Sequence, residues 1–239
     1  MKRRTWAIIG ASSIIAESFA QLVAEKGHSL LLIGRDQAQL AIIAADIEIR
    51  YSVLCEVMIA DFTQPIAPLI KLIDHHKNVD LFIAHSCMLN NHELNHHQIH
   101  ELLTINVVHT TQLIHAYLQK KQSTHRLIFI SSVAASRGRA KNSLYGASKA
   151  AIEIYLEGLQ QNAPKNQQIT IARLGFIDTH TTYGEPGIFY AAPPKTCAKA
   201  CLKALESGRS RIYYPFFWRY IMMVFKALPL LIYQKMGKF

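Results

Sequence analysis

The sequence predicts an α/β fold, a doubly wound parallel sheet of about seven strands with helices on both faces and an amphipathic extension at the C-terminus. Short apolar runs recur along the chain and are nearly continuous, as in strands that are buried on both faces. Helix-like stretches separate these runs, and strands that alternate with helices form parallel sheets. The length of 239 residues suits one domain of this kind.

The expected elements follow in order along the chain. Strands are expected at 6–9, 30–33, 53–59, 81–84, 127–130, 169–172 and 212–214. Helices are expected at 16–25, 37–49, 65–75, 97–118, 143–160 and 196–205. No internal repeat, low-complexity tract or linker interrupts this alternation. We therefore expect one domain over residues 1–214, followed by an extension over residues 215–239 that is not a separate domain.

Composition excludes several classes of protein. Hydrophobic residues make up 50% of the chain and charged residues 18%, which excludes intrinsic disorder, collagen-like repeats and a disulfide scaffold. The net charge of +10 favours phosphates, on a nucleotide, a nucleic acid or a membrane surface. The four cysteines form no CxxC motif, no secretory signal is visible, and no uncharged apolar stretch reaches the roughly 18 residues of a membrane span. We expect reduced thiols in a cytoplasmic protein.

The turn after the first strand is a candidate phosphate cradle. Gly10 follows the strand directly, Ser12 and Ser13 add hydroxyl donors, and a helix begins near Ile14 and Ile15. Free backbone N–H groups and the helix dipole favour an anion at such a helix N-terminus. The alternative is structural: Gly10 ends a strand and a serine caps the helix.

Charged residues after the second and third strands are candidates for binding a dinucleotide. Arg35 directly follows the second strand, where an arginine accommodates a 2′-phosphate and an acid binds a ribose 2′-hydroxyl. NADP(H) is therefore favoured over NAD(H), with Asp36 as the competing residue. Asp61 follows the third strand and could accept a hydrogen bond near an adenine amino group. The alternative is a helix cap through Asp61 or Thr63.

Tyr145 and Lys149 are spaced four residues apart in a predicted helix, so they share one face. An ammonium near a tyrosine favours the phenolate, and such a pair can exchange a proton with a carbonyl or an alcohol during hydride transfer. Ser132, at the end of the fifth strand, can hold the substrate oxygen beside this tyrosine. Asn106 stands inside a helical stretch, where asparagine is not favoured. Solvent-exposed Tyr and Lys residues at this spacing are common, so the prediction depends on the order and spacing of the whole set.

From residue 5 to about 214 the chain resembles the short-chain dehydrogenase/reductase family, and within it the decaprenylphosphoryl 2-keto-pentose reductase-like branch. The resemblance lies in residues 10–16, 84–86, 131–139, 144–151 and 215–229. It implies a Rossmann-type catalytic domain with Asn106, Ser132, Tyr145 and Lys149 as catalytic tetrad. Tyr145 would be the acid/base, and Lys149 would bind the nicotinamide ribose and lower the tyrosine pKa. Ser132 would orient the carbonyl, and Asn106 would hold a proton-relay water.

The resemblance also implies cofactor contacts in the later loops. These contacts are Ala84, His85, Gly175, Ile177 and Thr179, besides Tyr145 and Lys149. The sequence departs from the family pattern where Ile14 and Ala16 replace the second and third glycines of the turn. It departs again where residues 84–87 replace Asn-Asn-Ala-Gly and where Leu174 precedes Gly175. These changes affect cofactor affinity and loop shape, while the catalytic groups are kept. The loop over 179–194 is expected to cover the substrate site.

Two further patterns have simpler explanations. His92, Glu93 and His96 spell HExxH, which on a helix could bind zinc, but the motif falls in an expected loop and the start of the fourth helix. We expect no metal site there. Cys197 and Cys201 are expected to be ordinary helix residues.

Residues 215–233 are aromatic, apolar and basic, which suits either a core or dimer helix or a segment lying at a membrane surface. We expect a small-molecule or lipid-linked ketone or alcohol as substrate, including a keto-sugar, and peripheral contact with the inner face of a membrane. The resemblance implies a homodimer or homotetramer. We expect no nucleic-acid binding, because the basic residues form no recognised module. The alternative function is a catalytically impaired nucleotide-binding protein that acts at a membrane surface or as a scaffold.

Overall fold

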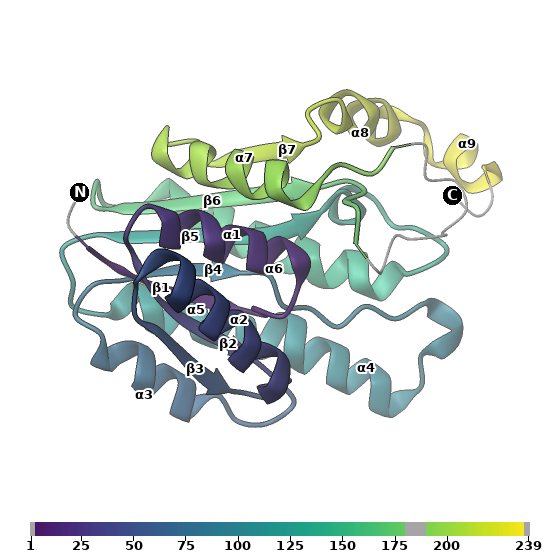
Figure 1. Ribbon diagram of the computed structural model, residues 1–239. Coiled ribbons are helices and arrows are strands. Elements are labelled where there is room, and N and C mark those ends of the chain that lie inside the picture. The colour runs from purple at the N-terminus through teal and green to yellow at the C-terminus, as the bar shows by residue number, and fades with distance from the viewer. Residues whose placement is uncertain (1–2, 180–189, 237–239) are drawn as a thin grey trace.

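The computed structural model describes residues 3–179 and 190–236. Seven strands form one sheet in the order β3-β2-β1-β4-β5-β6-β7, and every neighbouring pair is parallel (Figure 1). The strands are β1 (Thr5–Ile9), β2 (Ser29–Gly34), β3 (Cys55–Ile59), β4 (Val79–Ile83), β5 (His125–Ser132), β6 (Gln167–Leu174) and β7 (Arg211–Tyr214). The predicted fold class and all seven predicted strands are confirmed.

Helices cover both faces of the sheet (Figure 1). They are α1 (Ile14–Glu25), α2 (Gln37–Tyr51), α3 (Ala67–His75), α4 (His96–Leu103), α5 (Thr110–Gln119), α6 (Ser143–Gln161), α7 (Pro194–Glu206), α8 (Trp218–Ala227) and α9 (Leu230–Lys235). Alternate residues of β1 enter different cores: Ile8 packs with α1, α2 and α7, whereas Ala7 and Ile9 pack with α3, α5 and α6. This two-sided burial explains the continuous apolar runs in the sequence.

The helix predicted over 97–118 is interrupted in the structure. A π-helical segment, η2 (Thr104–His109), separates α4 from α5, and Asn106 lies within it. Such a wider turn inserts an extra residue into the helix and is frequent at functional sites. Apolar periodicity alone predicted one regular helix, and it could not reveal this interruption.

The sheet places its candidate ligand crevice at the carboxyl end of β1. This central strand pairs with β2 on one side and β4 on the other, and Ile9 is in register with both Ile33 and Ile83. The chain leaves β2 and β4 in opposite directions along the sheet, so the loops after β1 and β4 diverge. Ligands of open α/β sheets bind at such a switch point.

The C-terminal helices pack on the main domain. Trp218 and Met222 of α8 are buried against Val133, in the short 3₁₀ turn η3 (Val133–Ser136) that follows β5. In Figure 1 α8 and α9, drawn in yellow, lie on the side toward which the strands point. Within residues 3–179 and 190–236, none of the helices combines the length and the apolar character needed to cross a bilayer.

Replacing Gly175 by alanine is expected to destabilise the protein through α8. A Cβ atom at this position would lie 1.9 Å from Nε1 of Trp218, so the indole must move. Overpacking of this kind costs about 1–3 kcal/mol. Urea unfolding should show the loss, whereas Gly158→Ala in α6, where a Cβ meets no atom within 4 Å, should be neutral or stabilising. Equal urea midpoints of unfolding for Gly175→Ala and Gly158→Ala would contradict the close packing of Trp218 on Gly175.

Candidate active site

The turn between β1 and α1 forms a backbone cradle. Gly10 has a φ angle of +79°, which glycine adopts without strain. A Cβ atom there would lie only 2.7 Å from the backbone nitrogen of His85, so a larger residue would push the two segments apart. Ser13 caps α1 by accepting a hydrogen bond from the N–H of Ala16 at 3.2 Å. Capping is thus present, and the other N–H groups of the first turn still favour an anion.

The charged residues after β2 and β3 differ in whether their side chains are already hydrogen-bonded to the backbone. Asp36 caps α2, since its Oδ1 accepts a hydrogen bond from the N–H of Gln39 at 3.0 Å. Arg35 is exposed, and within the described residues its side chain forms no ion pair or hydrogen bond. Asp61 accepts a hydrogen bond from the N–H of Thr63 at 2.9 Å, so the local turn uses one of its oxygens. Arg35 is therefore the cation at this edge that is available to a ligand.

Tyr145 lies on α6 beside the turn that ends β5. A Cβ atom at Gly146 would lie 2.7 Å from the carbonyl oxygen of Ala134, so this glycine permits the close approach of α6 to η3. The tyrosine side chain is half-buried, and the hydroxyls of Ser132 and Ser86 lie close enough to act on its phenol. The structure thus brings together the predicted tyrosine and serine, and adds Ser86 from the loop after β4.

Burial raises the pKa of Tyr145 above its ordinary value. The nearby hydroxyls of Ser132 and Ser86 lower that pKa, and so does the guanidinium of Arg139. Arg139, rather than the predicted Lys149, is the cation that acts on the phenol in this structure. The phenol is therefore protonated at neutral pH and has a proton to give.

Lys149 is turned toward the sheet. Its side chain is buried, and its Nζ donates a hydrogen bond to the carbonyl oxygen of Ile130 at 2.9 Å. The ammonium also lies 4.9 Å from the ring centroid of Phe129. Burial lowers the pKa of Lys149 to about 8, and the carboxylate of Glu153 opposes that shift. This hydrogen bond directs the ammonium to the carbonyl of Ile130, and the groups that shift the pKa of Tyr145 are others.

A buried ionic network that the sequence analysis missed supports Lys149. Glu153 accepts hydrogen bonds from the hydroxyl of Ser131 and from Nε of Arg173, the latter at 2.7 Å. Arg173 also donates to the hydroxyl of Tyr213. Lys149 and Glu153 are spaced i, i+4 on α6, which was the available signal, because it places both charges on one helix face. The network fixes α6 against β5, β6 and β7.

Asn106 joins the π segment to two neighbouring parts of the site. Its Nδ2 donates hydrogen bonds to the carbonyl oxygen of Cys87 at 2.8 Å and to Oγ of Ser148 at 2.9 Å. Its Oδ1 accepts a hydrogen bond from the N–H of Cys87 at 2.7 Å. The side chain is buried and both of its polar atoms are hydrogen-bonded, so it holds the loop after β4 against α6. Its predicted relay water stays a prediction.

His85 presents an unpaired nitrogen beside the cradle. Its Nε2 lies 3.0 Å from Oγ1 of Thr110 and 3.3 Å from the carbonyl oxygen of Ile105, and that hydroxyl itself donates to the same carbonyl. Nε2 therefore carries the proton and Nδ1 is an acceptor. Burial lowers the pKa of His85 to about 3, and the Lys149 ammonium adds to that shift, so the ring is neutral. Nδ1 is buried and has no hydrogen-bond partner among the described residues.

The segment after β6 lies under the start of α8. The N–H of Gly175 donates to the carbonyl oxygen of Tyr214 at 2.9 Å, and Ile177 is buried in a parallel bridge with Ala192. Thr179 is the last described residue before the break. The loop predicted to cover the site over 179–194 lies mostly outside the described residues.

The C-terminal helices clasp the segment that follows η3. The guanidinium of Arg137 donates to carbonyl oxygens at the end of α8, including that of Leu228 at 2.8 Å, and lies 4.0 Å from the ring centroid of Tyr233. The Tyr233 hydroxyl donates to the carbonyl oxygen of the glycine after Arg137, at 2.6 Å. Arg139, two residues on, interacts electrostatically with both Tyr233 and Tyr145. This link between α9 and the candidate catalytic tyrosine was not predicted.

The HExxH stretch does not form one continuous helix. Asn91–Glu93 form a 3₁₀ turn and α4 begins at His96, so His92 and His96 do not share a helix face. Glu93 instead accepts a hydrogen bond from the N–H of Asn90 at 2.7 Å. Over the described ranges, no group of three or more His, Cys, Asp or Glu side chains could hold a metal ion. The cysteines of α7 are buried core residues, as predicted.

Comparison with known proteins agrees with this geometry. Residues 4–185 match the sequence profile of the short chain dehydrogenase family. An uncharacterised oxidoreductase of Staphylococcus saprophyticus is 27% identical over 209 residues, which cover 83% of this chain and 89% of that protein. The human inactive hydroxysteroid dehydrogenase-like protein 1 is 24% identical over 65% of this chain and 50% of its own length. A short-chain dehydrogenase of Sphingobium yanoikuyae, solved in complex with NADPH, superposes with a TM-score of 0.82 at 21% identity over 95% of this chain and 97% of that one.

The buried ammonium of Lys149 predicts an unusual dependence of stability on pH. The pKa of Lys149 is about 8 in the native protein and 10.5 for an ordinary lysine. Between pH 8 and pH 10.5 the unfolded chain therefore binds more protons than the native protein does. Stability of the native protein relative to Lys149→Met should therefore rise from pH 7 to 10, by about 2–3 kcal/mol. Urea unfolding across this range measures it, with Lys71→Met as the control for loss of an exposed lysine. A difference that stays constant with pH would contradict the buried charge.

Proposed function

The chain belongs to the short-chain dehydrogenase family of oxidoreductases, and from this premise we propose that it interconverts a ketone and a secondary alcohol with NADP(H), with Tyr145 as acid/base. The observation that carries the proposal is the placement of the Tyr145 hydroxyl. It lies beside the hydroxyls of Ser132 and Ser86, and Ser86 directly follows His85, which contacts Gly10 of the cradle. The protonated phenol is thus a neighbour of Ser86, and the residue before Ser86 contacts the candidate phosphate site.

The described residues fit NADP(H). The α1 N-terminus would hold the pyrophosphate, and the unpaired acceptor of His85 is a buried polar atom that a ligand hydroxyl would satisfy. Arg35 would bind the 2′-phosphate, because Asp36 is already occupied in capping α2. The solved relative from Sphingobium contains NADPH, which agrees with this preference. Gly175, Ile177 and Thr179 would contact the cofactor from the loop after β6.

The chain's own residues would move the proton while the cofactor supplies or accepts the hydride. Tyr145 would protonate the carbonyl oxygen, or deprotonate the alcohol in the reverse direction. Ser132 would hold that oxygen beside the phenol, and Arg139 would stabilise the phenolate that is left. Lys149, kept charged by Glu153, would bind the nicotinamide ribose. Asn106 would hold the loop after β4 against α6, so that both stay in place around these groups.

The substrate is proposed to be a keto-sugar or a lipid-linked ketone, reached through contact of residues 215–233 with a membrane surface. Apolar side chains on the outer faces of α8 and α9 support this contact, since Met223, Val224, Leu230 and Leu231 are each at least 59% exposed. Lys226 and Lys235 accompany them, and cations beside apolar groups suit an anionic bilayer surface. We further propose that residues 1–214 are the catalytic unit and that the protein forms a homodimer or homotetramer.

A second candidate is a nucleotide-binding protein that has lost turnover. It is favoured by the orientation of Lys149 toward Ile130, by Ile14 in the cradle, and by the human relative named inactive. This candidate predicts NADPH binding without oxidation of the cofactor by any ketone of a panel that includes keto-sugars. The proposed oxidoreductase predicts oxidation with at least one of them.

Replacing Tyr145 by phenylalanine tests the acid/base role. The variant keeps the ring but loses the transferable proton, and general acid catalysis contributes about 10²–10⁴-fold to a rate. We expect kcat to fall by at least about 100-fold in NADPH oxidation. NADPH binding, measured by fluorescence titration, should change by less than about threefold, since the phenol supplies little of the cofactor contact. Full turnover of the variant would overturn the mechanism.

Substitutions after β2 test the cofactor preference. Arg35→Ala removes the proposed partner of the 2′-phosphate, so NADPH should bind about 10–100-fold more weakly while NADH is unaffected. Asp36→Asn preserves a capping side chain and should leave both affinities unchanged. If Asp36 instead accepts a hydrogen bond from a ribose hydroxyl, Asp36→Asn will bind NADH more weakly, and the assignment to NADP(H) is wrong. Fluorescence titration with both cofactors separates these outcomes.

A further inference from the structure

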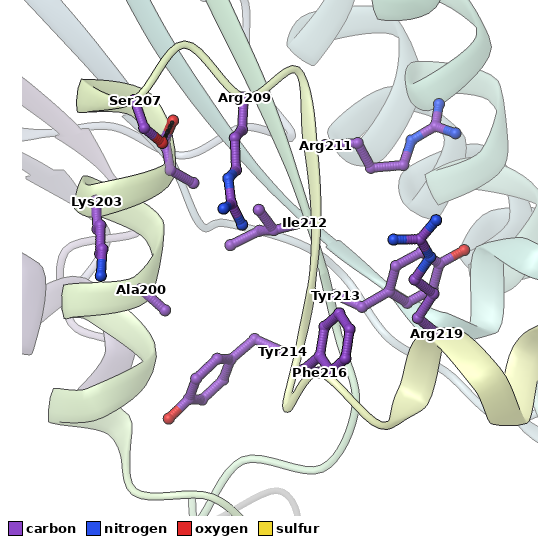
Figure 2. A pocket seen from close by; sticks show the side chains of 11 residues that line it. Ala200, Lys203, Ser207, Arg209, Arg211, Ile212, Tyr213, Tyr214, Phe216 and Arg219 are labelled. Carbon is purple, nitrogen blue, oxygen red and sulfur yellow. Dashed lines mark hydrogen bonds between the residues drawn. The ribbon is translucent and has the colours of Figure 1, made fainter.

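A cavity of about 520 Å³ opens along the outer edge of the sheet, between α7, β7 and the start of α8 (Figure 2). Four of its lining residues are cationic, and none is acidic. The cations are Lys203, Arg209, Arg211 and Arg219. Figure 2 places Lys203 and Arg209 on the side of α7, and Arg211 and Arg219 across the strand β7. The cavity therefore presents positive charge on both sides of an edge strand.

Most of this charge is not neutralised by the protein. Arg211 forms an ion pair with Glu157. The other three cations form no ion pair with any described acidic residue. Glu206, at the end of α7, is already paired with Lys26 at 2.7 Å, and no acidic residue follows it in the sequence. Concentrated charge of one sign in a concave site attracts an oppositely charged ligand.

An apolar stripe begins at this cavity and continues along α8. Phe216, which lines the cavity, packs edge-on against Tyr220 at 5.4 Å between ring centroids. Tyr220, Met223 and Val224 follow it at helical spacing, on the face opposite the buried Trp218, and are 54–60% exposed. Arg219, between the two aromatic residues, belongs to the cavity. A ligand in the cavity would thus meet guanidinium groups and, beside them, apolar side chains.

We infer that this cavity binds the phosphate of an anionic phospholipid headgroup while the stripe on α8 enters the headgroup boundary. Guanidinium groups bind phosphate oxygens in pairs, and aromatic side chains favour the interface between water and acyl chains. The inference rests on the membrane contact proposed above and is independent of the chemistry at Tyr145. It places headgroup recognition on α7 and β7 as well as on the C-terminal extension.

A second copy of the chain would fit this cavity less well than a phospholipid surface does, because of its charge. A symmetric contact through this edge would bring the same cations of both copies together, and like charges in an interface oppose association. A phospholipid surface supplies the missing negative charge and covers the apolar stripe.

Sedimentation with vesicles tests the inference on the full-length protein. One set contains phosphatidylcholine alone, and the other contains phosphatidylcholine with phosphatidylglycerol. Each cation near an anionic surface strengthens binding about fivefold, so Arg209→Gln combined with Arg219→Gln should weaken binding to the anionic vesicles about 25-fold. The control, Lys71→Gln combined with Lys121→Gln, removes two exposed lysines elsewhere and should change binding less than threefold. Met223→Ser should weaken binding to both vesicle types.

The outcomes separate this inference from the proposals that precede it. Absence of vesicle binding by the unmodified protein would overturn both the membrane contact and the cavity. Equal loss in the arginine and lysine pairs would overturn the cavity alone. Saturable binding of inorganic phosphate that the arginine pair abolishes, without preference for anionic vesicles, would identify a soluble phosphate ligand instead. A change of oligomeric mass in the arginine pair would identify a subunit interface. Turnover of a water-soluble ketone should be unchanged in the arginine pair.

Discussion

The approach of the Gly10 backbone to His85 is the constraint on which the candidate site depends. A side chain at residue 10 would force the turn after β1 away from the end of β4, because its Cβ would lie 2.7 Å from the backbone nitrogen of His85. The turn carries the N-terminus of α1, and the hydroxyl of the residue after His85 lies beside the phenol of Tyr145. Backbone packing therefore sets the distance between the candidate anion site and the phenol, and it does so with close contacts between backbone segments.

A second constraint is electrostatic. Lys149, Glu153 and Arg173 bring three charges into the interior, where an ion pair seldom stabilises more than apolar residues of similar volume. What the network contributes is orientation, since Glu153 is the acid that both cations face, and its removal would leave Lys149 and Arg173 without their partner. Glu153 binds groups on β5 and β6 at once, so α6 cannot rotate or slide without breaking several of these bonds. Tyr145, two turns before Glu153, is held in place by the same restraint.

The order of strands and helices could be predicted because burial on both faces leaves a direct trace in each apolar run. Candidate residues that follow strands, such as Arg35 and Ser132, could be predicted for the same reason, since carboxyl ends of parallel strands share one edge. The direction in which a side chain points could not be predicted from the apolar pattern. The spacing of Tyr145 and Lys149 places both on one face of α6, but whether the ammonium turns to the phenol or to Ile130 depends on groups far away in sequence. Arg139 and the clasp at Arg137 depend on contacts across about 90 residues, which periodicity does not encode.

The helix α8 joins the two parts of the molecule that the proposals concern. Its inner face packs on Gly175 and on η3, whose first residue follows Ser132, while its outer face starts at the cationic cavity. Its last carbonyls are held by Arg137, two residues before the guanidinium that acts on Tyr145. Both α8 and the carboxyl ends of the strands lie on one side of the molecule (Figure 1). A lipid-linked ketone held at that surface would therefore approach the phenol directly, so a catalytic site for such a substrate needs no channel through the sheet.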